Sequence, residues 1–206
     1  MLSEDVNPAL LLIVSGPAGS GKTTLSNRLQ EAFDPQLQRV ISSTTRSPRT
    51  GEKEGEDYYF FDNDTFDKQI EYAAFYEWAK VHNHRYGILK SEIQGKLAEK
   101  VDLILSIDVQ GAAHFREAAK SDAELALRLV TIFILPQDLE QLISRLRQRG
   151  DDDKDEIARR MQTAAREITQ SKHFNHRIIS RSREKDFTSL RALYRAEKQR
   201  SRTEER

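Results

Sequence analysis

A glycine-rich turn ending in lysine lies between an apolar run and a helix-length segment near the start of the chain. It reads Gly16-Pro-Ala-Gly-Ser-Gly21-Lys22-Thr23 and matches G-x-x-x-x-G-K-[ST], which in this context predicts a loop that binds a nucleoside triphosphate rather than a glycine turn with a chance lysine. We expect Lys22 to reach the β- and γ-phosphates and the Thr23 hydroxyl to bind Mg²⁺. The predicted ATP-binding residues are Gly16, Pro17, Ala18, Gly19, Ser20, Gly21, Lys22, Thr23 and Thr24.

A second group of residues suited to a phosphate follows at 42–58. Arg46 and Arg49 are three residues apart, with Pro48 fixing the turn between them, so both guanidinium groups can face one phosphate. The hydroxyl of Tyr58 can add a further donor. An Arg-x-x-Arg pair in a polar loop is also typical of a solvated loop, so the residues alone leave both interpretations open.

The elements that must position these residues follow an α/β pattern. Apolar runs of strand length lie at residues 10–14, 101–107, 130–135 and 177–179, and the clearest helical segments lie at 22–33 and about 186–199. Their alternation predicts a parallel sheet covered by helices. Pro136 is expected to end the strand at 130–135, since proline cannot donate to the ladder.

Two regions interrupt this alternation. Residues about 42–90 contain turns, aromatic runs and short strand-like pieces, and residues about 138–169 are helical in pattern and rich in arginine. Both are expected to project from the carboxyl edge of the sheet, where α/β proteins bind ligands. The predicted fold is therefore a three-layer α/β domain of the P-loop NTPase type, with a small β-containing insertion and a helical lid. One domain is expected over residues 1–206, with its core at about 1–41, 91–137 and 170–206.

Composition argues against several other classes of function. The 206 residues include 33 basic and 33 acidic ones and no cysteine, so there is no overall field to attract nucleic acid or an anionic membrane and no thiol chemistry. The longest apolar run, residues 9–14, is too short to cross a bilayer, and the acidic N-terminus lacks the basic region of a signal peptide. We expect a cytoplasmic protein, monomeric or homodimeric, that binds neither nucleic acid nor membrane.

Spaced motifs along the chain resemble those of the guanylate kinase family. Ser42-Ser-Thr-Thr-Arg46-Ser-Pro-Arg49-Thr-Gly-Glu52, followed by Gly55-Glu-Asp-Tyr58, is similar to the family segment that binds guanosine monophosphate (GMP). Further matches, over roughly residues 10–200, are Phe75-Tyr-Glu77-Trp-Ala79, Tyr86-Gly87, Ile107-Asp108-Val-Gln-Gly111, Phe133-Ile-Leu-Pro136, Arg145-Leu-Arg-Gln-Arg149-Gly150 and Arg159-Arg160. Several motifs in the correct order are more specific than the phosphate loop alone.

The resemblance implies a role for each matching residue. The GMP-binding residues that it implies are Ser42, Arg46, Arg49, Glu52, Tyr58, Glu77, Tyr86 and Asp108. The catalytic residues are Lys22, Arg46, Arg149 and Arg160, with Arg149 and Arg160 closing over the triphosphate. Arg46, Arg49, Tyr58 and Tyr86 would hold the acceptor phosphate.

Within that set, Ser42 and Glu77 would read the guanine. A carboxylate can accept hydrogen bonds from guanine N1–H and the 2-amino group, and a hydroxyl can donate to O6. Adenine lacks this pair of donors, so Glu77 would be left unpaired with AMP. The resemblance places Asp108 close to the acceptor nucleotide. Taken alone, Glu77 is equally a surface carboxylate, and Asp108 equally the N-cap of a helix over residues 109–120.

Three positions depart from the family pattern. Ile88 follows Tyr86-Gly87 where the family usually has serine or threonine, so a hydroxyl that could contact guanine is absent. Ser106 replaces the first aspartate of the usual Leu-Asp-Ile-Asp, which can weaken the placement of Mg²⁺ or of the acceptor. Ile178-Ile-Ser-Arg-Ser-Arg183, which includes Ser180 and Arg181, replaces the Val-Asn-Asp-Asp segment on the adenine side.

The expected activity is transfer of the γ-phosphoryl group of Mg·ATP to GMP, and to dGMP, giving ADP and GDP in purine nucleotide metabolism. One alternative is a kinase of the same scaffold with another acceptor, of the type that forms ribose 1,5-bisphosphate; Ile88 and Ser106 leave it open. Another is a non-catalytic guanylate-kinase-like binding module, which the retained phosphate loop, Arg149 and Arg160 argue against.

Overall fold

The computed structural model describes residues 8–138, 140, 142–143 and 154–204. Its centre is a five-stranded sheet in the order β2-β7-β1-β8-β9, with parallel neighbours throughout. The strands are β1 (Leu11–Ser15), β2 (Leu37–Arg39), β7 (Asp102–Ser106), β8 (Leu129–Pro136) and β9 (His176–Ser180). The four predicted strands are confirmed, and Pro136 is the last residue of β8. The sequence pattern does not predict β2, because three residues are too few to show a periodicity.

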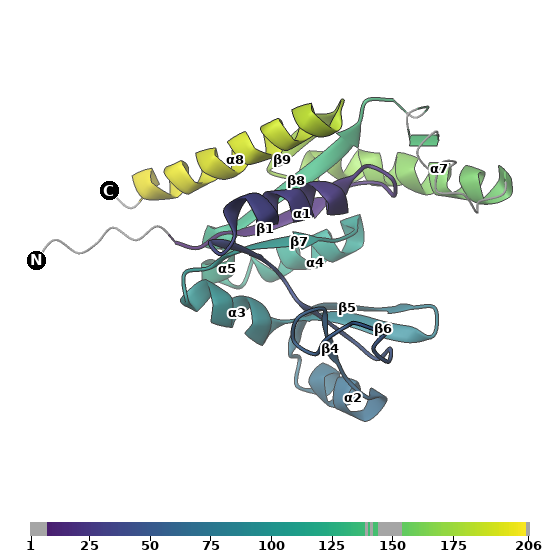
Figure 1. Cartoon of the computed structure of the whole chain (residues 1–206), viewed down its shortest axis with the longest axis vertical. Coiled ribbons are helices and arrows are strands. Elements are labelled where there is room, and N and C mark those ends of the chain that lie inside the picture. The colour runs from purple at the N-terminus through teal and green to yellow at the C-terminus, as the bar shows by residue number, and fades with distance from the viewer. Residues whose placement is uncertain (1–7, 139, 141, 144–153, 205–206) are drawn as a thin grey trace, which may run out of the picture.

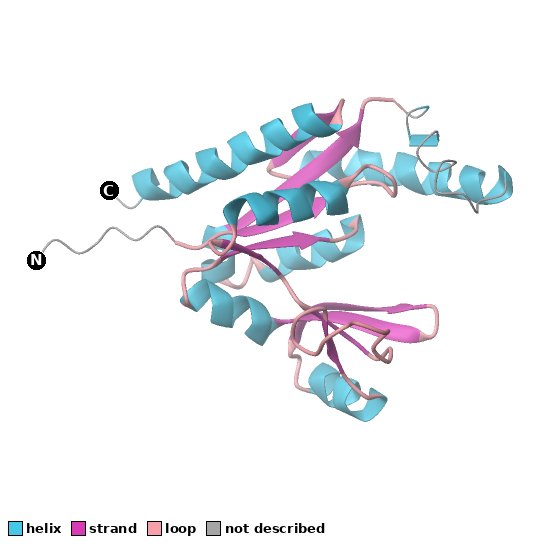
Figure 2. Ribbon diagram, in the orientation of Figure 1, coloured by secondary structure: helices cyan, strands magenta, loops and turns pink. Residues whose placement is uncertain are grey.

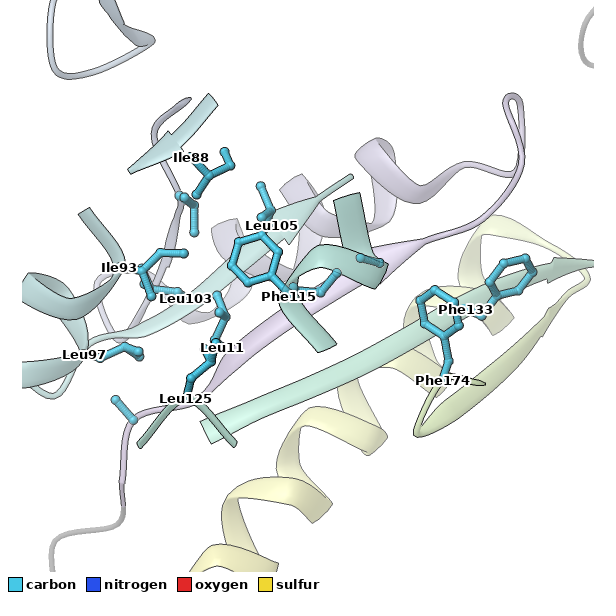
Figure 3. Close-up of a cluster of buried hydrophobic side chains, with 14 of the residues drawn as sticks. Leu11, Ile88, Ile93, Leu97, Leu103, Leu105, Phe115, Leu125, Phe133 and Phe174 are labelled. Atoms are coloured by element: carbon cyan, nitrogen blue, oxygen red, sulfur yellow. The ribbon is translucent and has the colours of Figure 1, made fainter. Parts of the chain in front are cut away.

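The central sheet is buried between two layers of helices. Side chains of β1 alternate between two cores: Leu11 and Ile13 belong to a cluster with helical residues between 93 and 125 (Figure 3), and Leu12 and Val14 to one with helical residues at 25–29 and 187–194. The helices are α1 (Lys22–Phe33), α3 (Lys90–Ala98), α4 (Val109–Ala118), α5 (Ala123–Arg128) and α8 (Arg183–Glu204). Figure 2 shows the three layers, as the predicted fold class requires.

A second, four-stranded sheet forms most of the region between β2 and α3. Its order is β4-β3-β6-β5, with strands β3 (Ser42–Thr44), β4 (Tyr58–Phe60), β5 (Phe75–Val81) and β6 (His84–Leu89). Helix α2 (Asn63–Glu71) covers one side and contributes Phe66, whose ring stacks on Phe75 at 4.7 Å between centres. This sheet lies beside the central one (Figure 1).

The arginine-rich region expected to be helical at 138–169 is described in part. Helix α7 (Lys154–Thr169) is followed by a short 3-10 turn, Gln170–His173. It lies toward the end of the sheet remote from both termini (Figure 1). Arg145 and Arg149 lie outside the described residues. Within the part of the chain that is described, no helix combines the length and apolarity needed to cross a membrane.

Candidate active site

The turn between β1 and α1 requires glycine for two separate reasons. Gly21 is the N-cap residue of α1 and has φ of 90°, a left-handed conformation that residues with a Cβ avoid. Gly16 lies against β8, where a Cβ would come within 2.6 Å of the carbonyl oxygen of Ile134. The sequence motif therefore corresponds to a loop that passes close to the sheet and turns directly into the N-terminus of a helix.

Lys22 and Thr23 lie at the start of α1, next to the carboxyl end of β7. The Lys22 Nζ donates to the carbonyl oxygen of Pro17 at 3.2 Å, so the side chain folds back over the loop. The Thr23 Oγ1 lies 3.4 Å from the Oγ of Ser106, the last residue of β7. Mg²⁺ prefers oxygen ligands and keeps several waters, so two neighbouring hydroxyls fit an ion whose remaining ligands are water and phosphate.

Arg46 and Glu52 form a two-point ion pair in the loop after β3. Arg46 Nη1 and Nη2 donate to Glu52 Oε2 and Oε1 at 2.8 and 2.9 Å, and the backbone N–H of Arg49 donates to Oε2 at 2.7 Å. These hydrogen bonds, led by those from Arg46, lower the pKa of Glu52 to about 2. Glu52 is therefore occupied by the two arginines and fixes the orientation of the Arg46 guanidinium.

Two tyrosines lie beside this guanidinium group. The Cζ of Arg46 is 5.2 Å from the centre of the Tyr58 ring, and the Tyr58 and Tyr86 rings meet edge to face at 6.2 Å. The pKa of Arg46 is raised, mainly by the hydrogen bonds and charge of Glu52 and further by Tyr86. Three of the predicted phosphate ligands thus come together from a loop, β4 and β6, and the side chain of Arg49 is exposed next to them.

Glu77, on β5, faces the start of α4 where the two sheets meet. Its side chain is only 15% exposed, and a Cβ on Gly111 would lie 3.3 Å from its Cδ. Asp108 is the N-cap residue of α4 and accepts from the Gly111 N–H at 2.8 Å, so the capping role considered for it is confirmed. The pKa of Glu77 is raised, mainly because the side chain is buried and also because of the negative charge of Asp108. The structure thus brings both of these carboxylates to one place.

Two further positions considered for base recognition lie on the second sheet. Ser42 is the first residue of β3 and pairs in register with Tyr58. Ile88 stands opposite Glu77 in the β5–β6 ladder, is 4% exposed, and belongs to the same core cluster as Leu105. The hydroxyl absent at position 88 is therefore replaced by a side chain that packs into the core next to Glu77.

The described part of the arginine-rich region contributes a carboxylate as well as arginines. Arg160 is half-buried on α7, and Glu167, two turns further along, is also half-buried. Burial chiefly raises the pKa of Glu167; the charge of Lys22 opposes that shift and the charge of Asp108 adds to it. Helix α7 therefore places Glu167 near the phosphate loop and the start of α4.

The segment on the expected adenine side is organised by a buried aspartate. Ser180 Oγ donates to Asp186 Oδ2 at 2.8 Å, and the backbone N–H of Arg181 donates to Oδ1 at 2.7 Å. Asp186 lies in the first turn of α8, so these bonds fix the connection from β9 to α8. The departure from the family pattern at this point thus leaves an ordered turn.

Two residues near the site, His114 and Glu167, are not predicted from the sequence. The Nδ1 of His114 lies 3.6 Å from Glu77 Oε2. Gly111 follows the N-cap Asp108 by three residues and His114 follows Gly111 by three, so Gly111 neighbours both on the surface of α4, but only the position of β5 shows which residue they face. Among the described residues, no group of three or more histidine, aspartate or glutamate side chains is arranged to hold a metal ion.

Comparison with known proteins gives a consistent result over nearly the whole chain. A family model described as guanylate kinase matches residues 9–197. The guanylate kinase of Polaromonas sp. is 38% identical to this chain over 191 residues, which cover 93% of this chain and 89% of that protein. The guanylate kinase of Geobacter sulfurreducens is 41% identical over 171 residues, which cover 83% of this chain and 80% of that protein. The crystal structure of guanylate kinase from Anaplasma phagocytophilum has a TM-score of 0.66 at 28% identity, covering 94% of this chain and 87% of that one.

Proposed function

Because the chain belongs to the guanylate kinase family, we propose that it transfers the γ-phosphoryl group of Mg·ATP to GMP, and to dGMP, giving ADP and GDP. Family membership supports the reaction class and the nucleotide substrates. Two separate groups of side chains that suit phosphate, one around Lys22 and one around Arg46, support the proposal. Two phosphate sites on one face of an α/β fold suit a donor and an acceptor.

The observation that carries the choice of acceptor is the buried carboxylate of Glu77. A carboxylate out of water is costly unless donors satisfy it. Guanine offers two adjacent donors, N1–H and the 2-amino group, whereas adenine offers an acceptor at N1. A site built to accept two hydrogen bonds rejects a ligand that lacks them by roughly 10⁴–10⁵. Glu77 therefore supports GMP over AMP as the acceptor.

The residues at the phosphate sites have complementary roles in this proposal. The glycine loop and Lys22 bind the β- and γ-phosphates of ATP, while Arg46, Tyr58 and Tyr86 hold the phosphate of GMP. Glu52 acts through Arg46 as a positioning residue, since both of its oxygens accept from arginine donors.

Transfer between two bound phosphates depends on placement and on stabilisation of charge, and needs no added general base. Thr23 and Ser106 would hold Mg²⁺, which supplies positive charge to the phosphate oxygens. Arg160, with Arg149 of the undescribed segment, would add further positive charge when the lid closes and excludes water. Arg46 lies on the acceptor side of the same reaction.

The proposal assigns these roles to three parts of one domain. Residues about 1–41, 91–137 and 170–206 form the core that binds ATP, about 42–90 bind GMP, and about 138–169 form the lid. A cytoplasmic role in purine nucleotide metabolism as a monomer or homodimer, without nucleic acid or membrane, completes the proposal. The balanced charge of the chain, with 33 basic and 33 acidic residues, supports the proposal that it binds neither nucleic acid nor membrane.

The test is a coupled assay of ADP release with Mg·ATP and a panel of acceptors: GMP, dGMP, AMP, UMP, CMP and ribose 1,5-bisphosphate. Lys22→Ala serves as the blank, because it removes the cation that contacts the transferred group. We expect GMP to be turned over fastest, with dGMP next. Equal or faster turnover of AMP or the sugar phosphate would overturn the guanine assignment, and no turnover with any acceptor would favour a binding module.

A further inference from the structure

His114 is an exposed residue whose ring lies against the buried carboxylate of Glu77. Its side chain is 56% exposed, yet its Nδ1 is 3.6 Å from Glu77 Oε2. It lies on α4, six residues after the N-cap Asp108, and Gly111, three residues from each, lies between them on the helix surface. Because Gly111 has no side chain, Glu77 comes within van der Waals distance of the helix.

Two groups on α4 act on Glu77 in opposite directions. Burial and the charge of Asp108 raise the pKa of Glu77, while the charge of His114, whose Nδ1 is 3.6 Å away, lowers that pKa. The neighbouring strand presents Ile88, an uncharged side chain, opposite Glu77.

Neighbouring charged and titratable groups have partners of their own. The hydroxyl of Tyr76, the residue before Glu77, lies 3.3 Å from Asp122 Oδ2. On the helix of His114, Glu117 pairs with Lys120 at 2.6 Å. Among the described groups around Glu77, His114 is therefore the one that favours the ionised carboxylate.

We propose that His114 is a positioning residue for base recognition, which keeps Glu77 ionised and oriented to accept hydrogen bonds from guanine N1–H and the 2-amino group. This inference rests on the proposed function, because it concerns the binding of GMP at the same site. It adds a residue outside the motifs that identify the site. It also predicts that the KM for GMP rises less at acidic pH than it would if the buried carboxylate of Glu77 had no cationic neighbour.

The sign of the pH effect follows from the two groups. As pH falls, protonation of Glu77 removes an acceptor and weakens GMP binding. A positive charge on the His114 ring, 3.6 Å from the carboxylate, opposes that protonation. Without His114, the KM for GMP must therefore rise more steeply as pH falls. The phosphate of GMP also titrates near pH 6, but this affects every variant equally and cancels in a ratio of KM values.

The experiment measures the KM for GMP, the KM for ATP and kcat from pH 8 to pH 5.5 for the wild-type protein and for His114→Gln. We expect the ratio of the variant's KM for GMP to that of the wild type to increase by roughly twofold to fivefold over this range, as for an ion pair with one exposed partner. The variant-to-wild-type ratios of the KM for ATP and of kcat should stay constant over the same pH range. His173→Gln, which removes an exposed histidine of the turn after α7, is the matched control.

A second variant separates charge from the loss of the ring. His114→Lys restores a positive charge, so the ratio of its KM for GMP to that of the wild type should stay constant as pH falls. A His114→Gln ratio that does not change with pH, or that changes equally in His173→Gln, would overturn the inference while leaving GMP kinase activity intact. An absence of GMP turnover in the wild-type protein would instead contradict the proposed function.

Discussion

Arg46 and Glu52 are joined at two points, with the guanidinium nitrogens of Arg46 2.8 and 2.9 Å from the two carboxylate oxygens of Glu52. A carboxylate next to an anion-binding group opposes anion binding unless donors already occupy it. Here both oxygens accept from arginine donors, and the backbone of Arg49 supplies the third bond. In the proposed site, Glu52 would therefore orient the Arg46 guanidinium toward the acceptor phosphate.

Substitution of Glu52 by glutamine tests this arrangement. Glu52→Gln removes the charge that fixes Arg46, so kcat/KM for GMP should fall by roughly 10- to 100-fold, the range for hydrogen bonds to charged groups. The KM for ATP should stay within about twofold of the wild-type value, because the phosphate loop follows β1 of the central sheet whereas Glu52 follows β3 of the second sheet. Steady-state kinetics at saturating Mg·ATP measure the effect.

The control is Glu56→Gln, which removes an exposed carboxylate of the same loop whose ion-pair partner is Lys53. Exposed pairs contribute little, so this variant should behave like the wild type. If Glu52→Gln and Glu56→Gln gave the same kinetics, Glu52 would have no special role in positioning Arg46.

Ser106 offers a test of the metal site. The Thr23 and Ser106 hydroxyls are 3.4 Å apart, and neither carries a charge. Ser106→Asp places a carboxylate beside Thr23, so the Mg²⁺ concentration for half-maximal activity should fall by roughly 10-fold, the lower end of the effect of groups supporting a metal ion. A titration of activity with Mg²⁺ at fixed ATP measures it. Ser106→Ala, which removes one of the two hydroxyls, should raise the Mg²⁺ concentration for half-maximal activity; an equal requirement in all three proteins would place the ion away from Ser106.

How much of the fold and the site can be predicted from the sequence depends on how far apart along the chain the interacting residues are. The strand at 10–14, the glycine turn and the helix at 22–33 are local patterns, and the structure has β1 and α1 in those places. The relation of Glu77 to His114 is different, since it joins a strand of one sheet to a helix on the other, 37 residues later. No periodicity connects them, so only the packing of β5 against α4 identifies His114.

Ile88 and Ser106 illustrate the same limit for departures from a pattern. The sequence indicates that a hydroxyl and a carboxylate are absent at these positions, but not what replaces them. In the fold, Ile88 is held by the core beside Glu77, and Ser106, at the carboxyl end of β7, lies beside the Thr23 hydroxyl at the start of α1. The family match gives the identity of the site, whereas the consequences of its altered residues follow from three-dimensional contacts.

A buried carboxylate far from the phosphate loop is expected to control stability. Asp102 has a side chain only 4% exposed. It accepts from the Leu10 N–H at 2.8 Å, the Lys198 Nζ at 2.9 Å and the Tyr194 hydroxyl. It thus ties β1, β7 and α8 together. Asp102→Asn leaves the Lys198 ammonium without its carboxylate, which should lower the free energy of unfolding by about 3–5 kcal/mol.

Urea denaturation measures that change in the free energy of unfolding. Glu117→Gln, which removes one member of an exposed pair with Lys120, is the control and should change stability by less than about 1 kcal/mol. Similar denaturation midpoints for Asp102→Asn and the wild type would show that the network around Asp102 contributes little.

The central claim is that Glu77 reads the guanine of the acceptor. The most direct measurement is kcat/KM for GMP and for AMP in the wild-type protein and in Glu77→Gln, at saturating Mg·ATP and pH 8. We predict that the wild-type protein favours GMP by at least about 10³, and that the variant loses roughly 10²-fold or more of kcat/KM for GMP while its KM for ATP is unchanged. A Glu77→Gln variant that retained the wild-type preference for GMP over AMP would contradict the account.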